Sequence, residues 1–425
     1  MQYGDQLEVA TVDVPGAYLR ALPPEGVRQA MRINKTLSAM FVKLVPEWEQ
    51  YLDQRGCLVV VLKKALYGCV FSARQWYLLV VEQLTALGYT ANPYDKCVFN
   101  KGTTTIFVHV DDFFITCKGS GTMDEVLAAL ETKFPGINIH RGRIVNYLGM
   151  TFDFTDCTGV KVTAKQFITE LLRDNEDIKG HAATPALPDL FTIDKNAPVL
   201  QRKQKERYHS TVMRFMYIAK RVRPEILGAT AFLSTKVQQP TMSDENKLQR
   251  VLRYIRGTHD MGLNLCATGT QLHSYIDASF AVHNDKKSHS GSILTMGRGA
   301  TFARSRKQSI NTTSSTTAEQ VGVAEELTAV LWANKFLHAQ GHPKAPAIVH
   351  QDNESTMEML NKGESTADRT RHIDIKYFFA HDCIKRHEII LKYTPTEDMI
   401  ADILTKPLQG NAFRRLGTLL LNWHV

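Results

Sequence analysis

Short runs of apolar residues flank an acidic pair in residues 105–116, which read TIFVHVDDFFIT. Apolar runs on both sides of Asp111 and Asp112 predict two short strands joined by a tight bend. Such a bend can bring both carboxylates near one site, where a divalent cation would relieve their repulsion and lost solvation. The alternative is a solvated hairpin turn, in which Asp is a common residue.

Other patterns in the first half of the chain predict the elements around this hairpin. Residues 7–14 alternate loosely and predict a strand that ends at Asp13, five residues before Tyr18. Asp13 is then either an ordinary turn residue before a Pro-Gly pair or a third carboxylate of the same site. Further predicted elements are a strand at 58–62, helices at 76–87 and 123–134, a strand starting at Tyr147 and a helix at 167–172.

The composition changes twice between residues 174 and 223. Residues 174–198 are polar and contain three prolines, so they predict a linker without regular structure. Residues 201–223 are rich in Lys and Arg, with aromatic residues between them. This pattern fits either a solvated amphipathic helix or a track for a nucleic-acid backbone.

From about residue 272 the pattern becomes three strands, a helix, a strand and further helices. The first strand, 273–279, contains Asp277; a turn at 286–293 leads into the second strand, and 300–305 is the third. A helix at 317–337 carries Glu319 in its first turn, and a strand at 348–353 carries Asp352 near its end. Each acid alone has an ordinary explanation, as a strand-end turn residue or as a partner of the helix dipole.

The composition fits a globular protein of two or three domains, since 425 residues with 44% hydrophobic content can form several cores. The formal net charge of +8, from 51 basic and 43 acidic residues, suits a polyanionic partner. Seven scattered cysteines without a C-x-x-C pair argue against zinc sites and for a reducing compartment. No apolar run has membrane-spanning length, so we expect no membrane partner.

Eight segments together resemble the Pol polyproteins of copia-type LTR retrotransposons, over about residues 7–416. The hairpin at 105–116 resembles the x-V-D-D hairpin of reverse transcriptases, and Asp13 with Tyr18 has the spacing of their first palm motif. The other segments are 62–77 (LKKALYGCVFSARQWY), 147–150 (YLGM), 223–226 (RPEI), 252–258 (LRYIRGT), 369–374 (RTRHID) and 400–406 (IADILTK).

The resemblance implies two active sites. In the reverse transcriptase palm, Tyr18 contacts the sugar of the incoming nucleotide, and the catalytic metal ligands are Asp13, Asp111 and Asp112. The strand order after residue 272 resembles the ribonuclease H fold, whose catalytic, metal-binding acids correspond to Asp277, Glu319, Asp352 and Asp402. Such carboxylate clusters fit two-metal phosphoryl transfer with Mg²⁺, for which Mn²⁺ can substitute. Residues 369–374 are placed near the substrate without a catalytic role.

The resemblance also implies partners and a location. The partners are an RNA template, a DNA primer, an RNA–DNA hybrid, deoxynucleoside triphosphates and other parts of the same polyprotein. The location is the cytoplasm, within a virus-like particle, or the nucleus. Three departures from the family pattern are His109 in place of an aromatic residue, Ala73 in place of a proline, and a first palm Asp so near the start that the fingers are expected to be absent.

We therefore predict a multidomain protein of the α+β and α/β classes. Its parts are a reverse transcriptase palm (1–175), a thumb- or connection-like helical region with a linker (176–268) and a separately folding ribonuclease H-like domain (269–425). The predicted function is RNA-directed DNA polymerase and RNA–DNA hybrid ribonuclease in a fragment of a larger polyprotein, with weak primer extension by the isolated chain. The alternative is a truncated, polymerase-inactive retroelement relic that acts at most as a nuclease or a nucleic-acid-binding scaffold.

Overall fold

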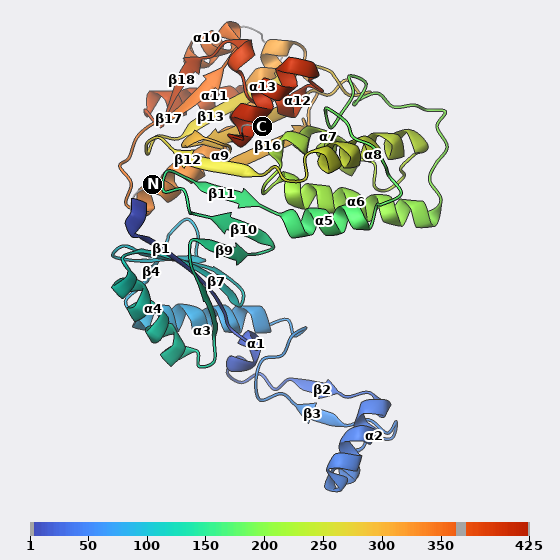
Figure 1. The fold of residues 1–425 in the computed structure, drawn as a ribbon, viewed down its shortest axis with the longest axis vertical. Coiled ribbons are helices and arrows are strands. Elements are labelled where there is room, and N and C mark those ends of the chain that lie inside the picture. Colours follow the sequence, from blue (N-terminus) through green and yellow to red (C-terminus); the bar gives the residue numbers. More distant parts are fainter. Residues whose placement is uncertain (1–3, 363–370, 424–425) are drawn as a thin grey trace. The chain divides into compact units, whose positions relative to one another are not determined.

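The computed structural model describes residues 4–362 and 371–423, and for 371–377 it describes the backbone alone. The chain divides into two compact units, residues 6–142 and residues 143–425, the latter joined by the first residues of the chain. Figure 1 shows helices and sheets mixed in both units. The predicted fold class, α+β and α/β with more than one domain, is confirmed.

A six-stranded antiparallel sheet forms the centre of the 6–142 unit, in the order β4-β5-β6-β7-β1-β8. Its strands are β1 (Leu7–Asp13), β4 (Thr90–Ala91), β5 (Val98–Lys101), β6 (Thr104–His109), β7 (Asp112–Lys118) and β8 (Asn138–Arg141). Buried residues alternate along β6, where Thr104, Ile106 and Val108 face the core. The strands predicted at 7–14 and on both sides of the acidic pair are confirmed.

Three helices belong to the same core: α1 (Ala17–Arg20), α3 (Ser72–Ala86) and α4 (Ser120–Lys133). Trp76, Val80 and Leu84 follow at four-residue spacing on α3 and are fully buried, which is the helical period of a core-facing stripe. They share one core with Met123 of α4 and Phe113 of β7. The helices predicted at 76–87 and 123–134 are confirmed, each with an earlier start.

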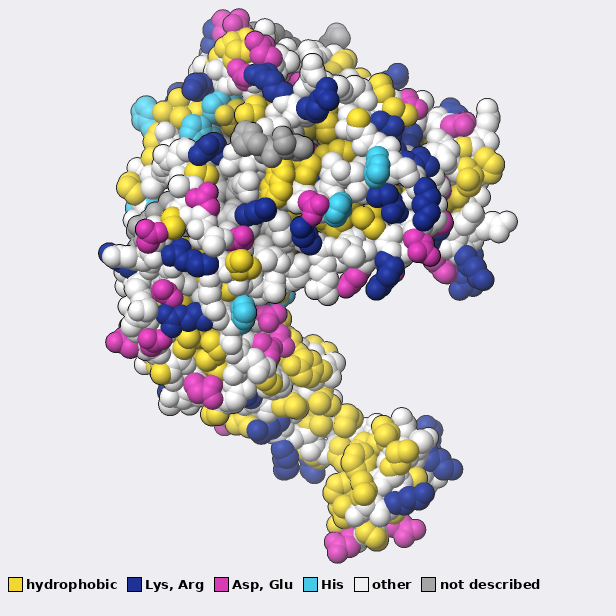
Figure 2. Space-filling model, in the orientation of Figure 1, with side chains coloured by type: hydrophobic (Ala, Val, Ile, Leu, Met, Phe, Trp, Pro, Cys, Tyr) yellow, Lys and Arg dark blue, Asp and Glu magenta, His cyan; other side chains and the backbone are white. Residues whose placement is uncertain are grey.

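A small lobe of the same unit lies between α1 and α3 in the sequence. It contains β2 (Ala30–Arg32) paired with β3 (Val59–Val61), the helix α2 (Lys35–Leu44) and the 3-10 helix η2 (Pro46–Tyr51). Figure 2 shows apolar side chains gathered over this lobe, and Met40, Leu44 and Tyr51 are each more than half exposed. The lobe therefore buries little of its own apolar surface.

Two five-stranded sheets form the framework of the 143–425 unit. The first, β15-β12-β11-β10-β9, is antiparallel throughout. The second, β16-β14-β13-β17-β18, is antiparallel on one side of β13 and parallel on the other. The strands are β9 (Ile144–Tyr147), β10 (Met150–Asp153), β11 (Val160–Thr163), β12 (Leu263–Ala267), β13 (His273–Ser279), β14 (His289–Thr295), β15 (Gly297–Arg298), β16 (Phe302–Lys307), β17 (Ala347–Gln351) and β18 (Ile389–Tyr393).

The predicted start of a strand at Tyr147 is wrong. β9 ends at Tyr147, and the chain turns through Leu148 and Gly149 into β10. Both turn residues have positive φ, 48° and 73°, which is the left-handed region that a tight hairpin turn uses. The Leu-Gly pair therefore marks the turn of a hairpin and not the start of a strand.

Helices surround both sheets of the 143–425 unit. They are α5 (Lys165–Arg173), α6 (Arg202–Ala219), α7 (Leu227–Ser234), α8 (Met242–Gly257), α9 (Ser315–Ala339), α10 (Glu354–Lys362), α11 (Arg371–Lys385), α12 (Asp402–Thr405) and α13 (Gly410–Leu421). Residues 174–198 contain no helix or strand, as their prolines predicted. Within the described ranges, no helix is both long enough and apolar enough to cross a bilayer.

One hydrophobic core joins the helical region to the end of the chain. Phe215 of α6 and Ile255 of α8 share this core with Leu404 of α12 and Phe413 of α13. The helix α7 approaches so closely that a Cβ on Gly228 would lie 3.2 Å from the Leu404 carbonyl oxygen. The C-terminal part therefore shares one core with residues 143–268, and its separate folding stays a prediction. The boundaries at 175 and 268 remain a proposal about functional regions.

Arg223 has a structural role inside this core. It is fully buried, its Nε lies 2.6 Å from Glu225 Oε1, and its Nη1 donates to the Thr258 carbonyl oxygen at 2.9 Å. Its planar guanidinium can satisfy an acid and a carbonyl at once, which allows the charge to be buried. Arg223 is therefore not part of a basic surface, unlike the exposed cations of α6.

Candidate active sites

Three aspartates meet at neighbouring strand ends in the 6–142 unit. Asp13, the last residue of β1, lies opposite Asp112, the first residue of β7. Opposed residues of antiparallel strands point to the same face, with Cα atoms about 4.5–5.5 Å apart. Asp111 occupies the two-residue turn between β6 and β7, beside Val110, whose φ is 58°. The hairpin expected around the acidic pair is confirmed. Its turn places Asp111 at the same edge of the sheet as Asp13 and Asp112.

Two hydrogen bonds hold this turn in place. The indole Nε1 of Trp76 donates to the Val110 carbonyl oxygen at 2.5 Å, and the Val14 N–H donates to the Asp111 carbonyl oxygen at 3.0 Å. A β-branched residue at positive φ is strained and persists only where its surroundings fix it. The Trp76 bond therefore ties the buried face of α3 to the position of Asp111.

The pKa of Asp112 is raised above its ordinary value, first by burial and then by the charges of Asp111 and Asp13. His109, directly opposite Asp112, acts in the other direction. Asn138 of β8 donates its amide to Asp13 Oδ2 at 2.9 Å. The three acids thus repel one another while neighbouring polar groups orient them, an arrangement that a bound cation would stabilise.

Tyr18 lies against a second tyrosine beside these acids. The rings of Tyr18 and Tyr67 are 4.5 Å apart between centroids and inclined by 35°. The pKa of Tyr67 is raised by burial and by the charges of Asp111 and Asp13, so Tyr67 lies close to the acidic edge. The sequence placed Tyr67 only within a family signature, and no spacing rule linked it to Asp13 or Tyr18.

A second acidic cluster lies in the 143–425 unit. Asp277 stands on the central strand β13, Glu319 in the first turns of α9, and Asp352 directly after β17. One ligand oxygen of each lies within 4.8 Å of the others. Among the described residues, this is the group of acids whose ligand oxygens converge in this way. The carboxylates of Asp13, Asp111 and Asp112 lie farther apart and would have to turn toward one another to share an ion.

Polar contacts orient the carboxylates of this second cluster. The Ala278 N–H donates to Glu319 Oε1 at 3.1 Å, and the Gln351 amide donates to Glu319 Oε2 at 3.3 Å. The Thr396 hydroxyl donates to Asp352 Oδ2 at 2.9 Å. No sequence pattern pointed to Gln351 or Thr396, because neither belongs to a motif and Thr396 is far from Asp352 along the chain.

Asp402 joins the cluster through a lysine. It begins the one-turn helix α12, and Lys406, four residues later, lies 2.8 Å from Asp402 Oδ1 and 3.3 Å from Asp277 Oδ1. The Thr405 hydroxyl donates to Asp277 Oδ2. The IADILTK segment therefore supplies an acid, a hydroxyl and a cation to one site, of which only the acid was expected.

Burial and mutual repulsion raise the pKa of two acids in the cluster. The pKa of Glu319 lies well above its ordinary value because the side chain is buried and because Asp277 and Asp352 are close. Burial and then the charge of Asp277 raise the pKa of Asp402 to about 7, against the opposing effect of Lys406. Convergent oxygen ligands that are costly to ionise together fit a hard divalent cation such as Mg²⁺ or Mn²⁺.

A glycine in the neighbouring strand makes room for α12. Gly291 lies opposite Asp277 in the register of β13 and β14, and a Cβ there would lie 2.8 Å from Leu404 Cβ and from Thr405 Cγ2. Real Cβ atoms do not approach so closely, so a side chain at this position would push α12 off the sheet. The close approach therefore sets the distance between Asp402 and Asp277.

Gly291→Ala is expected to destabilise the protein by about 1–3 kcal/mol, because overpacking must be relieved by moving α12. Gly322→Ala is the matched control. It lies in α9 on the opposite face of the same sheet, where a Cβ would meet Ser290 Oγ at 3.4 Å, an ordinary contact, and the helix would gain. Denaturant unfolding of both variants measures the difference, and equal stability would contradict the packing argument.

A groove of about 790 Å³ lies between α6, α7 and the edge strand β16. Its cations are Lys220, Arg221, Arg304, Arg306 and Lys307, and its described lining includes no acid. The last three cations are partly neutralised, since Arg304, Arg306 and Lys307 pair with Glu326, Glu325 and Asp285. Arg304, Arg306 and Lys307 thus line a groove together with Lys220 and Arg221, two exposed cations that directly follow α6.

One expected segment cannot be placed in full. Residues 369–370 of the RTRHID string lie outside the described residues, and the side chain of His372 is not described. Residues 224–226 form a 3-10 helix, and 252–258 lies at the end of α8, where the Thr258 carbonyl receives the Arg223 bond. These two segments therefore act in packing.

Comparison with known proteins agrees with this architecture. A family model described as "Reverse transcriptase (RNA-dependent DNA polymerase)" matches residues 8–188. The chain is 28% identical over 371 residues to the retrovirus-related Pol polyprotein from transposon TNT 1-94 of Nicotiana tabacum, covering 84% of this chain and 28% of that one. It is 28% identical over 381 residues to the Pol polyprotein from transposon RE1 of Arabidopsis thaliana, covering 87% and 25%. The chain thus spans about a quarter of the length of these relatives.

A solved structure shares the fold. The foamy viral protease-reverse transcriptase in complex with an RNA/DNA hybrid aligns with a TM-score of 0.52 over 95% of this chain and 46% of that one, at 14% identity. The alignment covers residues of both compact units, so the likeness in fold extends over both. The chain is therefore similar to reverse transcriptases over residues 8–188 and, over most of its length, to retrotransposon Pol polyproteins.

Proposed function

We propose that this chain is an RNA-directed DNA polymerase and an RNA–DNA hybrid ribonuclease, with one active site in each compact unit. The observation that carries the nuclease proposal is the meeting of Asp277, Glu319 and Asp352 from three separate elements within 4.8 Å. The polymerase proposal is supported by the family match and by the register of Asp13 opposite Asp112. Nucleic-acid partners are supported by the family and by the net charge of +8.

In the palm, the acids Asp13, Asp111 and Asp112 would hold Mg²⁺ or Mn²⁺. Bound divalent ions activate the attacking oxygen and stabilise the leaving one. The Trp76 bond fixes the turn that carries Asp111, and Asn138 orients Asp13. The ring of Tyr18, supported by Tyr67, would lie beside the sugar of the incoming nucleotide, and ribonucleotide incorporation by a Tyr18→Val variant measures that role.

In the nuclease site, water would attack the RNA strand of the hybrid, and Asp277, Glu319 and Asp352 would hold the metal, with Asp402 beside them. Ala278 and Gln351 fix Glu319, and Thr396 fixes Asp352, so that the oxygens stay convergent before any ion binds. Preorganised ligands of this kind lower the reorganisation needed at the reaction step. Primer extension and hybrid cleavage by the full chain, each measured beside a single-site variant, test both halves of the proposal.

The groove at 220–221 and 304–307 is proposed as a contact surface for a nucleic-acid backbone. A double variant, Lys220→Gln with Arg221→Gln, is expected to weaken hybrid binding and to lower the slope of log K against log salt by about 2, since each lost phosphate contact removes about one released counterion. Lys203→Gln on α6, outside the groove, is the control for general charge. Equal slopes for wild type and the double variant would exclude the groove as a phosphate contact.

A further inference from the structure

Lys406 lies between two of the four acids of the nuclease site. Its Nζ is 2.8 Å from Asp402 Oδ1 and 3.3 Å from Asp277 Oδ1, and the two carboxylate side chains are 7% and 2% exposed. Among the described residues, Lys406 is the one basic side chain of the Lys or Arg type that forms an ion pair with an acid of this cluster. In so dry a site the attraction between an ammonium and a carboxylate is much stronger than in water. The chain therefore supplies a cation of its own to the cluster.

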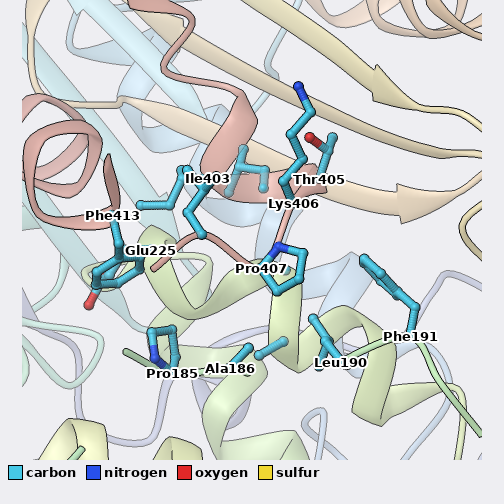
Figure 3. A pocket seen from close by; sticks show the side chains of 14 residues that line it. Pro185, Ala186, Leu190, Phe191, Glu225, Ile403, Thr405, Lys406, Pro407 and Phe413 are labelled. Atoms are coloured by element: carbon cyan, nitrogen blue, oxygen red, sulfur yellow. The ribbon is translucent and has the colours of Figure 1, made fainter. Parts of the chain in front are cut away.

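The surrounding backbone holds Lys406 in this position. Lys406 ends α12 in an extended conformation, and its N–H donates to the Asp402 carbonyl oxygen at 2.8 Å. Thr405 anchors the same turn to Asp277 through its hydroxyl. Figure 3 shows the Lys406 side chain extending away from Pro185, which lies on the other side of the small pocket under α12. The turn is thus packed on one side and presents its ammonium on the other.

Asp277 consequently belongs to two cation positions. It forms the first with Glu319 and Asp352, whose ligand oxygens lie within 4.8 Å. It forms the second with Asp402, and there the ammonium of Lys406 lies between the two Oδ1 atoms. A Mg²⁺ ion binds its oxygens at about 2.0–2.1 Å, so it cannot share the same two oxygen lone pairs with an ammonium.

We propose that Lys406 takes the place of the second divalent ion in this site. The chain then binds one Mg²⁺ or Mn²⁺ through Asp277, Glu319 and Asp352, and it admits a second ion between Asp277 and Asp402 only when Lys406 moves aside. This inference rests on the proposed ribonuclease site and concerns the number of ions that the site holds. A lysine that served folding alone would leave that number unchanged on removal.

The test counts Mn²⁺ ions bound to the full chain. An Asp111→Asn background weakens the palm site, and the electron paramagnetic resonance signal of free Mn²⁺ reports the bound fraction. We expect one ion for the wild-type lysine and for Lys406→Arg, and two for Lys406→Met, with the second bound at least about tenfold more tightly than in the wild type because a positive charge has been removed. Spin coupling between neighbouring ions should appear only in the Met variant.

A matched control is available on α10. Lys362 forms the same kind of i,i+4 pair, with Glu358 at 2.6 Å, but both side chains are about two-thirds exposed. Lys362→Met should leave the number of bound ions at one. If Lys406→Met proves unstable without metal, the rise in melting temperature on adding Mn²⁺ gives a second measurement, which should be larger for Lys406→Gln than for wild type.

The outcomes separate this inference from the proposed function. The role of Lys406 alone would be overturned by one bound ion in Lys406→Met together with a thermal shift in Lys406→Gln equal to that of the wild type. Two ions bound to the wild type would overturn it as well. A wild-type chain that binds no ion in the Asp111→Asn background and cleaves no hybrid would overturn the nuclease proposal itself.

Discussion

Asp277→Asn is expected to lower cleavage of a labelled RNA–DNA hybrid more than about 100-fold in the full chain with Mg²⁺ or Mn²⁺. Asp277 is the acid that both cation positions share, so its loss affects every ion in the site. Losing partners of metal ligands already costs about 10–100-fold in affinity or activity, and losing a ligand costs more. Asn has nearly the volume of Asp and can still accept the Thr405 hydroxyl bond, so the fold should survive.

The control for this variant is Asp382→Asn on α11, which makes the same chemical change at an exposed acid paired with Arg386. It should cleave like wild type and unfold within about 1 kcal/mol of it. In an Asp111→Asn background, which weakens the palm site, Mn²⁺ should raise the melting temperature of the control but not that of Asp277→Asn. Cleavage that persists in Asp277→Asn, or in the presence of a chelator, would show that these carboxylates are not the active site.

Local pattern predicted the elements that carry the acids. The two strands that flank Asp111 and Asp112, the strand ending at Asp13, and the strand 273–279 lie where the apolar residues indicated. The order of acids along the chain then pointed to two clusters. The distances within each cluster could not be predicted from the sequence, because those between Asp277, Glu319 and Asp352 depend on how three elements pack.

The polar groups that orient the acids could not be predicted from local patterns, for the same reason. Thr396 reaches Asp352 across 44 residues of sequence, and Trp76 reaches Val110 across 34, so no periodicity connects either pair. The core that α6 and α8 share with α12 and α13 could not be predicted from the sequence either. Buried residues of the helices between 202 and 257 share one core with Leu404 and Phe413, which come some 150 residues later, and no local pattern connects them.

The palm offers the second large effect. Asp111→Asn is expected to lower primer extension on an RNA template by more than about 100-fold while leaving hybrid cleavage unchanged, because the two acidic clusters lie in different compact units. Single-turnover extension with enzyme in excess registers even a slow wild-type rate. Asp277→Asn should show the converse, with extension retained and cleavage lost.

The palm variant has its own matched control in Asp124→Asn. Asp124 is an exposed acid of α4 in the same unit, paired with Arg141 at 2.6 Å, and its side chain is 67% exposed. Neutralising it changes the charge of the unit as Asp111→Asn does but leaves the strand edge intact, so extension should stay within about twofold, as expected for a surface pair worth about 0–1 kcal/mol.

Reciprocal loss of one activity per variant would assign each reaction to its own cluster. Extension that survives in Asp111→Asn would mean that the turn holding Val110 in its strained conformation has a structural role alone. A folded wild-type chain that extends no primer but cleaves hybrid would leave the nuclease as its activity. Neither reaction in a folded chain would support the nucleic-acid-binding scaffold, because the acids would then be retained without the chemistry that their convergence makes possible.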